Sequence, residues 1–336
     1  MNILFTCAGR RNYLINYFKK ALNGDGKVFA SDMQLTAPSL VDADVAIQVP
    51  AIYSEDYIPT LINIIKENQI AAVISLNDLE LPILSYAKNE INKLGAKVIV
   101  SDQHIITTAF DKWETAKFIE ACGLKTPKTF ISLQKAKAAL ARGELTFPLV
   151  VKPRWGSASI GIDFPEDMEE LVLSYKLQVL RLKRSILAEA SKQDLDRAIL
   201  IQEKIPGKEY GMDVLNNLDG HYVGTFVREK LHMRSGETDK AISVIDSRFE
   251  HVGKTIGEEL KHIGNMDVDV FEHNGNLYVL ELNPRFGGGY PFSHEAGMDT
   301  ASAYVSWLKG NDDLREFNNY KAGMMFSKCD YLLKVN

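Results

Sequence analysis

The stretch Leu277 to Pro291, LYVLELNPRFGGGYP, carries the most information about the fold. Its first part, LYVLEL, is predicted to be a β-strand whose successive side chains point to opposite faces. This alternation predicts Leu277, Val279, Glu281 and Asn283 on one face. A carboxylate and an amide oxygen are therefore expected side by side at the end of the strand.

A second predicted strand upstream holds another carboxylate, Asp269, inside an apolar run. The segment His273 to Asn276, HNGN, predicts a tight turn that pairs the two strands and brings Asp269 near Glu281. Two carboxylates and an amide are typical of a Mg²⁺ site, and Arg285 just beyond adds a planar cation suited to phosphoryl oxygens. The alternative is a hairpin with surface charges, but carboxylates among apolar strand residues need charged partners.

A third informative stretch is Phe147 to Gly161, FPLVVKPRWGSASIG. It predicts a buried strand that ends in Lys152 and is followed by a loop of small residues whose backbone N–H groups suit a triphosphate. The order differs from a Walker A loop, because the lysine precedes the glycines. A strand followed by a Pro/Gly turn is also a common structural connection. The loop residues concerned are Gly156, Ser157, Ser159 and Gly161.

Three further polar residues lie beside predicted strands or helices. Lys112 begins a helix predicted to continue to Cys122, where it is suited to phosphate contact, with solvent exposure as the alternative. The stretch ILIQEKIPGKEYGMDV predicts a strand ending in Glu203, a turn, and a second strand containing Glu209. Glu203 and nearby backbone groups are suited to an adenine edge, and Glu209 to ribose hydroxyls.

The composition is that of an ordinary globular protein: 46% of the 336 residues are hydrophobic. Lys and Arg number 39 against 44 Asp and Glu, a net charge of -5, so nucleic acid is not an expected partner. No stretch approaches the roughly 20 apolar residues of a membrane span, so no membrane partner is expected either. The three cysteines are expected to be buried thiols in a reducing compartment, which predicts a cytoplasmic protein.

The first hundred residues alternate between short apolar strands and amphipathic helices, which predicts a parallel α/β unit. From Asp111 the pattern changes, and the charged stretch from Glu166 to Arg197 predicts helices with one solvated face. The expected strands are 2–7, 28–31, 71–76 and 97–100, and the expected helices are 12–22, 57–68 and one after Pro82.

Taken in order, the lysines, the Gly/Ser loop, the glutamates and the Asp269 and Glu281–Arg285 segments resemble the ATP-grasp superfamily. Within it, ILFTCAGRRNYL, SLNDLELP, SGETDKA and LNPRFGGGYPFSHEAG resemble single-module proteins related to the carbamoyl-phosphate synthase large subunit. The resemblance implies a mixed α/β and α+β fold, a pre-ATP-grasp parallel α/β domain followed by a two-part ATP-grasp fold. The implied limits are 1–105 for the first domain, 106–310 for the ATP-grasp domain with a lid at about 126–203, and 311–336 for a C-terminal tail packed on it.

The resemblance also assigns roles residue by residue. It implies that Lys112 and Lys152 contact ATP phosphates and that residues 156–161 form a flexible phosphate loop. It implies adenine contacts from Glu203 and the backbone of Lys204 and Ile205, and a ribose contact from Glu209. The implied Mg²⁺ ligands, with Mn²⁺ as the alternative ion, are Asp269, Glu281 and Asn283, and the implied catalytic residues are Arg285 and Lys152.

The implied activity is that of an ATP-dependent ligase, which activates a small carboxylate as an acyl phosphate and joins it to an amine. One alternative is an ATP-binding regulatory or scaffold protein without turnover. A Rossmann oxidoreductase is a second, but the segment CAGRR lacks the G-x-G-x-x-G fingerprint. The acid, the amine and the oligomeric state stay open, a homodimer included.

Substrate contacts are expected from residues that follow predicted strands or occupy loops. Arg234, with Gly236 and Glu237, suits a carboxylate or an amine, although an exposed loop arginine is an equal alternative. Arg10 and Arg11 follow the first strand, where α/β sheets open their ligand crevice. The predicted contacts are Arg234, Glu237, Arg10, Asn77 and Asp78, with Glu80, His294 and Glu295 as further candidates.

Overall fold

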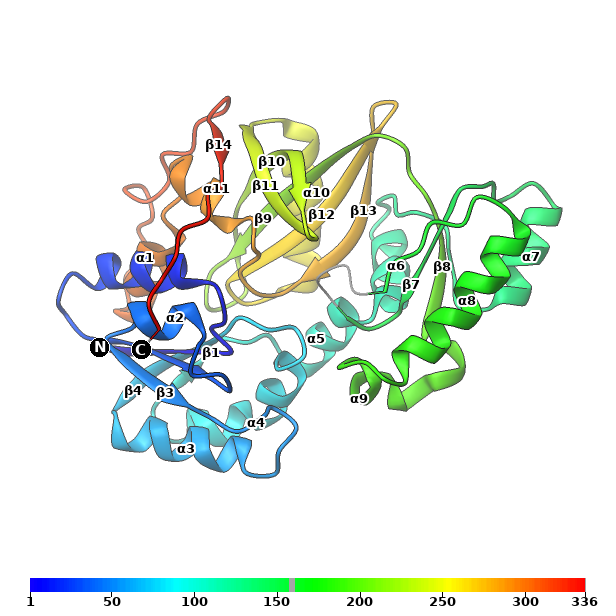
Figure 1. Cartoon of the computed structure of the whole chain (residues 1–336). Helices are drawn as coiled ribbons and strands as arrows, with labels where there is room; N and C mark the ends of the chain where they lie inside the picture. Colours follow the sequence, from blue (N-terminus) through cyan, green and yellow to red (C-terminus); the bar gives the residue numbers. More distant parts are fainter. Residues whose placement is uncertain (157–160, 336) are drawn as a thin grey trace.

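The N-terminal part of the chain is a five-stranded parallel sheet with strand order β3-β2-β1-β4-β5. The computed structural model describes residues 1–156 and 161–335. Helices cover both faces of this N-terminal sheet (Figure 1), which confirms the α/β prediction. Its strands are β1 (Asn2–Thr6), β2 (Val28–Asp32), β3 (Val45–Gln48), β4 (Ile70–Ser75) and β5 (Lys97–Val98), and its helices are α1 (Asn12–Leu22), α2 (Pro38–Asp42), α3 (Tyr57–Glu67), α4 (Leu81–Asn92) and α5 (Gln103–Phe110).

A six-stranded antiparallel sheet, here called the central sheet, has the order β13-β12-β9-β10-β11-β14. Helix α10 packs on it, and Phe249 and Ile256 from this helix join Val268 and Val279 in one core. The elements are α6 (Lys112–Ala121), β9 (Lys208–Asn216), β10 (Tyr222–Arg234), β11 (Glu237–Val244), α10 (Ser247–Leu260), β12 (Asn265–His273), β13 (Asn276–Asn283) and β14 (Met325–Ser327).

A small three-stranded antiparallel sheet, here called the lid sheet, forms the third part, at the right of Figure 1. Helix α8 packs against it through Leu171 and Leu182, while its charged side faces solvent as the sequence predicts. The elements are β6 (Thr129–Phe130), α7 (Leu133–Ala141), β7 (Leu149–Pro153), α8 (Met168–Leu182), α9 (Ala188–Ser191), a 3₁₀ turn (Lys192–Arg197) and β8 (Ile199–Glu203).

The last helices, α11 (Tyr290–Glu295) and α12 (Thr300–Leu308), return to the N-terminal sheet. Tyr304 of α12 packs edge-on against Phe18 of α1 at a centroid distance of 5.9 Å, and both belong to one core with Phe5 of β1. The chain then pairs β14 with β11 and runs down beside α1 (Figure 1), where the Tyr331 hydroxyl accepts a hydrogen bond from Asn12. The C-terminal segment therefore contacts both the central sheet and the N-terminal part.

Candidate active site

The predicted carboxylate pair lies where two cavities meet. Asp269 of β12 is directly opposite Glu281 of β13 in the antiparallel ladder, as the hairpin prediction requires. Both side chains line a cavity of about 520 Å³ between the lid sheet and the central sheet. Both also line a second cavity of about 880 Å³ between the central sheet and the loops of the N-terminal sheet. These are called the smaller and the larger cavity below.

The strand that carries Glu281 does not alternate regularly. Consecutive residues of β12 pair with Glu281 and Val279, so Leu280 is the extra residue of a β-bulge. Leu277 and Val279 are buried in the core with Leu282, whereas Glu281 faces the cavities. The prediction that Leu277 and Val279 share a face with Glu281 was therefore wrong, because one inserted residue reverses the alternation.

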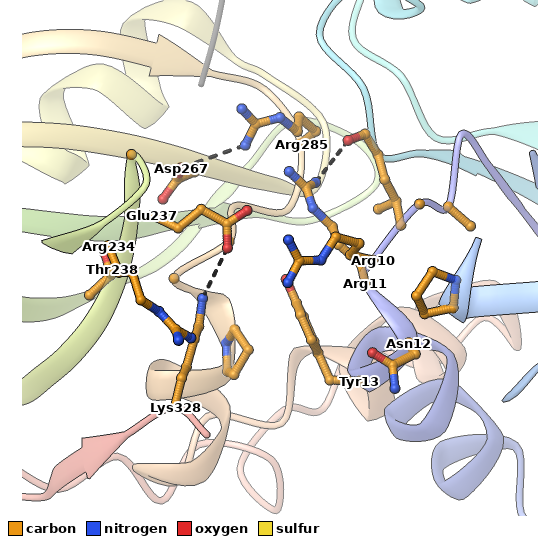
Figure 2. A pocket seen from close by; sticks show the side chains of 18 of the residues that line it. Arg10, Arg11, Asn12, Tyr13, Arg234, Glu237, Thr238, Asp267, Arg285 and Lys328 are labelled. Atoms are coloured by element: carbon orange, nitrogen blue, oxygen red, sulfur yellow. Dashed lines mark hydrogen bonds and ion pairs between the residues drawn. The ribbon is translucent and has the colours of Figure 1, made fainter. Parts of the chain in front are cut away.

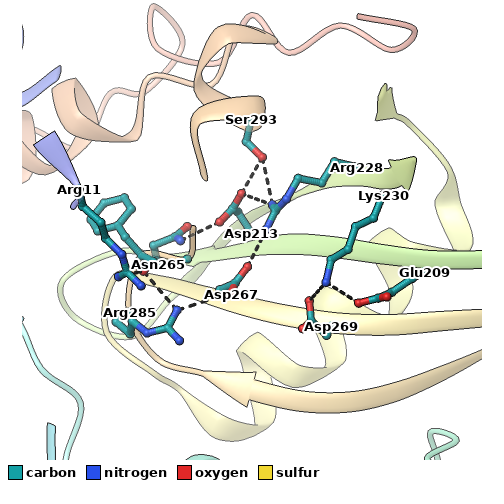
Figure 3. Close-up of polar contacts among 12 residues, drawn as sticks. Arg11, Glu209, Asp213, Arg228, Lys230, Asn265, Asp267, Asp269, Arg285 and Ser293 are labelled. Carbon is teal, nitrogen blue, oxygen red and sulfur yellow. Dashed lines mark hydrogen bonds and ion pairs between the residues drawn. The ribbon is translucent and has the colours of Figure 1, made fainter. Parts of the chain in front are cut away.

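Two lysines hold the carboxylate pair. Lys230 of β10 bridges Asp269 and Glu209, with its Nζ at 2.7 Å and 2.6 Å from the two carboxylate oxygens (Figure 3). The Nζ of Lys112, at the start of α6, lies 3.2 Å from Glu281 Oε2 and also donates to a backbone carbonyl of the lid loop. Lys112 is therefore not solvent-exposed, and Lys230 is a site residue that sequence reasoning missed.

The electrostatic environment shifts the pKa values of the two carboxylates in opposite directions. Burial raises the pKa of Asp269 to about 6, with Lys230 acting in the opposite direction. Burial would also raise the pKa of Glu281, but Lys112 and Lys152 outweigh it and lower this pKa to about 2. Burial lowers the pKa of Lys152 itself to about 8. Glu281 is thus a firmly charged anion near two ammonium groups at neutral pH.

The smaller cavity brings together most of the residues predicted for nucleotide contact. Its wall combines apolar side chains such as Val150, Phe164 and Phe271 with several lysines. Gly161 does not line it and packs against Gln178 of α8. Ser157 and Ser159 lie outside the described residues. The predicted residues that line the smaller cavity are Lys112, Lys152, Gly156, Glu203, Ile205 and Glu209.

Arg285 lies in the larger cavity and links the central part of the molecule to the N-terminal sheet. Its Nη2 donates to Asp78 Oδ2 at 2.7 Å, and its Nη1 lies 3.6 Å from Asp267 Oδ2. Although burial acts the other way, these carboxylates raise the pKa of Arg285. Asn283 lines the same cavity and pairs with Asp267 across the hairpin. The predicted substrate residue Asp78 is therefore already paired with Arg285 in this structure.

A buried charge network lies beneath this site, and sequence reasoning missed it. Arg228 of β10 donates to Asp213 and to Asp267, both at 2.6 Å (Figure 3). Asn265 and Ser293 donate to the two oxygens of Asp213. A guanidinium with two carboxylates is tolerated in a core because each charge has a partner. The sequence signal was a row of charged residues inside apolar strands.

The glycine run 287–289 is explained by this network. A Cβ atom on Gly287 would overlap the Asp267 carboxylate, and one on Gly289 would overlap the Arg228 guanidinium. A Cβ atom on Gly288 would meet Glu237 at an ordinary 3.5 Å. The glycines thus let the backbone pass close over two buried charged groups.

The predicted substrate residues Arg10, Asn77, Asp78, Arg234 and Glu237 all line the larger cavity. Arg234 pairs with Asp330 and Asp239, and Glu237 pairs with Lys328 at 3.3 Å (Figure 2). The Asn77 side chain caps its own turn by accepting from the Leu79 N–H at 3.0 Å.

Three of the further candidates have structural partners. His294 stacks on the ring of Tyr17 at 3.6 Å between centroids, and Glu295 accepts from the Tyr17 hydroxyl. Neither lines the larger cavity, so the suggestion that they do was wrong. Glu80 is buried and accepts hydrogen bonds from Thr6 and Ser75. All three side chains are therefore engaged in packing and hydrogen bonds outside the two cavities.

The structure bears on three further expectations, which concern a metal site, the cysteines and a membrane span. The described residues contain no group of three or more His, Cys, Asp or Glu side chains that converges as a metal site; the predicted set has two carboxylates and an amide. Cys329 is exposed, so the expectation of three buried thiols was wrong. None of the described helices has both the length and the apolar character to cross a membrane.

Comparison with known families matches the two parts of the chain separately. Residues 109–289, more than half of the chain, match the ATP-grasp domain, and the chain belongs to this family. Residues 3–99 match the PylC-like N-terminal domain. The predicted ATP-grasp membership is therefore confirmed.

Individual relatives support the same assignment. The carbamoyl phosphate synthase large chain of Campylobacter jejuni is 27% identical over 254 residues, which cover 71% of this chain and 22% of that protein. The chain spans about a fifth of the length of the curated relatives it matches. A biotin carboxylase domain from Hydrogenobacter thermophilus, in complex with MgADP, ADP and bicarbonate, has a TM-score of 0.74 at 17% identity over 96% of this chain and 73% of that chain. An L-amino acid ligase from Bacillus licheniformis has a TM-score of 0.69 at 19% identity over 92% of this chain and 75% of that chain. The two solved structures share the fold.

The glycine run gives a matched test of the buried network. Gly289→Ala should lower the free energy of unfolding by about 1–3 kcal/mol, because the added methyl displaces Arg228. Gly288→Ala should change it by less than about 0.5 kcal/mol, because its Cβ finds ordinary space. Neither backbone is left-handed, so strain is not a factor. Denaturant unfolding measures both variants, and equal losses would contradict the explanation.

Lys152 gives a test that depends on pH. The pKa of the Lys152 ammonium group is about 10.4 in the unfolded chain and about 8 in the folded protein. Between these two pH values the unfolded state binds more protons than the folded state. The buried charge therefore lowers the free energy of unfolding by its full amount below pH 8, and by less as the pH rises toward 10. Lys152→Met should therefore stabilise the ligand-free protein at pH 7, and the gain should shrink toward pH 10.

Denaturant unfolding in EDTA at both pH values makes this measurement. Lys135→Met, on the exposed side of α7, is the control and should change little at either pH. A Lys152→Met variant that is less stable than the wild type at pH 7, or whose difference does not vary with pH, would contradict the assignment.

Proposed function

We propose that the protein is an ATP-dependent ligase that joins a carboxylic acid to an amine. The observation that carries the proposal is the position of Asp269 and Glu281 at the junction of two cavities. The smaller cavity combines apolar walls with the cations Lys112 and Lys152. The larger cavity is lined by guanidinium groups, including Arg285. This arrangement suits a nucleotide on one side and an acid on the other.

ATP binds in the smaller cavity in this proposal. Glu203 and the backbone at Ile205 contact the adenine, and Glu209 contacts the ribose. Lys112 and Lys152 neutralise the phosphates, and membership in the ATP-grasp family supports this placement. The phosphates of ATP would add negative charge to that of Glu281 beside the buried Lys152, whose pKa burial lowers in the ligand-free protein.

The donor set fits a hard cation such as Mg²⁺, with Mn²⁺ as the alternative. Asp269 and Glu281 present carboxylate oxygens from facing positions of one ladder, and Asn283 adds an amide oxygen on the same side as Glu281. When bound, the ion would neutralise charge on the phosphate oxygens. Lys230 and Lys112 hold the two carboxylates in place meanwhile.

The first chemical step transfers the γ-phosphoryl group. A carboxylate oxygen of the acid attacks the γ-phosphorus, the bond to the β–γ bridging oxygen breaks, and ADP leaves with an acyl phosphate as the other product. Arg285, oriented by Asp78, stabilises the charge on the transferring group, and Lys152 stabilises it from the opposite side. The planar guanidinium suits phosphoryl oxygens in two directions at once.

The second step forms the amide. The amine nitrogen attacks the acyl carbonyl carbon, loses a proton, and releases inorganic phosphate when the carbon–oxygen bond breaks. The proposed division of the chain follows this chemistry: residues 1–105 and the tail 311–336 form walls of the larger cavity, and the ATP-grasp domain 106–310, with its lid at 126–203, binds ATP. The whole activity of the longer carbamoyl phosphate synthase relatives does not follow from this chain.

Amine-dependent release of ADP tests the function. With ATP, Mg²⁺ and acid–amine pairs, ADP should form fastest when both acid and amine are present. Glu281→Gln should lower this rate about 100-fold or more while the fold is retained, because it removes a charge from the phosphate end of the site. Glu272→Gln, on the same hairpin but outside both cavities, is the matched control and should keep the wild-type rate.

The same assay separates the ligase from a non-catalytic ATP-binding protein. A wild-type protein that binds ATP and forms no ADP with any acid and amine would favour the scaffold alternative. Unchanged turnover in Glu281→Gln would remove the carboxylate pair from the mechanism.

A further inference from the structure

The larger cavity has more room and more positive charge than the reacting carboxylate of a small acid needs. Its volume of about 880 Å³ lies near the upper end of ordinary ligand pockets. In Figure 2, Arg10, Arg11 and Arg285 form one side of this cavity. Glu237 and Lys328 lie on the facing side. The two sides therefore differ in how their charges are balanced.

Most cations of this cavity already have a carboxylate partner. Those with a partner are Arg228, Lys230, Arg234, Arg285 and Lys328. Arg10 and Arg11 form no ion pair with any carboxylate in the part of the chain that the structure describes. These two guanidinium groups thus have no carboxylate at ion-pair distance among the described residues, although Asp78 and Asp267 act on Arg11 from farther away.

Arg11 is fixed in position by the backbone. Its Nη1 donates to the carbonyl of Leu76 at 2.8 Å and to that of Phe286 at 2.6 Å, which leaves its other N–H groups for a ligand. Burial, and after it the neighbouring Arg285, lower the pKa of Arg11. A guanidinium nevertheless stays protonated at neutral pH, so this charge is held in place by backbone carbonyls, with no carboxylate of the described residues at ion-pair distance.

The start of helix α1 adds to the same charge. Arg11 is the residue before the first helical position, no side chain caps the helix, and its first turn contains no acidic residue. Asn12 and Tyr13 of that turn line the cavity. A helix N-terminus carries about half a positive charge and presents free backbone N–H groups. The helix N-terminus and the two arginines therefore all favour an anionic ligand.

We propose that the acid substrate carries a second anionic group, a carboxylate or a phosphate, which Arg11, Arg10 and the first turn of α1 bind. This inference rests on the proposed ligase function and names the class of acid that the enzyme uses. The reacting carboxylate then lies toward Arg285 and the Asp269–Glu281 pair, and the second anion lies at the N-terminal wall.

Direct binding to matched acids tests the inference. The probes are three pairs whose members differ by one anionic group: L-glutamate and L-glutamine, succinate and succinamate, and O-phospho-L-serine and L-serine. Calorimetric titration into protein saturated with ADP and Mg²⁺ should find, in at least one pair, about tenfold or more tighter binding of the member with the extra anion. The phosphoserine pair distinguishes a phosphate from a carboxylate as the second group.

Variants of Arg11 test whether this residue causes the preference for the acid with the extra anion. Arg11→Gln should remove the preference within the pair, whereas Arg11→Lys, which keeps the charge but loses the fork, should retain only part of it. Arg142→Gln, on the exposed end of α7 and paired with Glu144, is the control and should bind like the wild type. ADP affinity should be the same in all three variants, which checks that the fold is intact.

The outcomes separate this inference from the ligase proposal. If the extra anion gives no tighter binding in any pair, or if Arg11→Gln keeps the preference, the anion site is overturned even when amine-dependent ADP release is observed. If the preference and its loss in Arg11→Gln are found without such release, the anion site stands and the ligase proposal fails.

Discussion

The charge balance around two carboxylates on one β-hairpin is the constraint on which the rest of this structure depends. Asp269 and Glu281 face each other across the ladder and are mostly shielded from water. Their compensation comes from the central sheet through Lys230 and from α6 and the lid sheet through Lys112 and Lys152. The central sheet and the segments beside it thus both supply charge that the hairpin needs, and the smaller cavity lies between the central sheet and the lid sheet.

A second set of charges connects this hairpin to the N-terminal sheet. Arg285 joins the segment after β13 to Asp78 after β4, and Arg228 holds Asp213 and Asp267 beneath it. Removing one partner of a buried pair is far more costly than replacing the whole pair, so these groups stabilise one arrangement of the cavity wall. The glycine run exists because the backbone must pass directly over them.

Much of this could be predicted from local sequence pattern, and the rest depends on contacts between distant segments. The hairpin at Asn274 and Gly275, the βαβ beginning and the carboxylate pair follow from turn residues and alternation. The bulge at Leu280 cannot be predicted from the sequence of β13 alone, because it is defined by the pairing of β13 with β12. Lys230 was missed because its two partners lie on β9 and β12. Arg11 was expected at the ligand crevice, but its two backbone carbonyl partners come from distant segments that no local pattern connects. Ser157 and Ser159 lie outside the described residues, so their phosphate contacts stay predictions.

The central claim is that the γ-phosphoryl group passes to a carboxylate oxygen. The most direct measurement uses an acid substrate whose carboxylate is labelled with ¹⁸O, together with ATP and an amine, and determines the isotope content of the released phosphate by mass spectrometry. The account predicts one ¹⁸O atom transferred into each phosphate, whichever amine is used. Phosphate that carries no label from the acid would contradict it, because ATP would then have been hydrolysed by water.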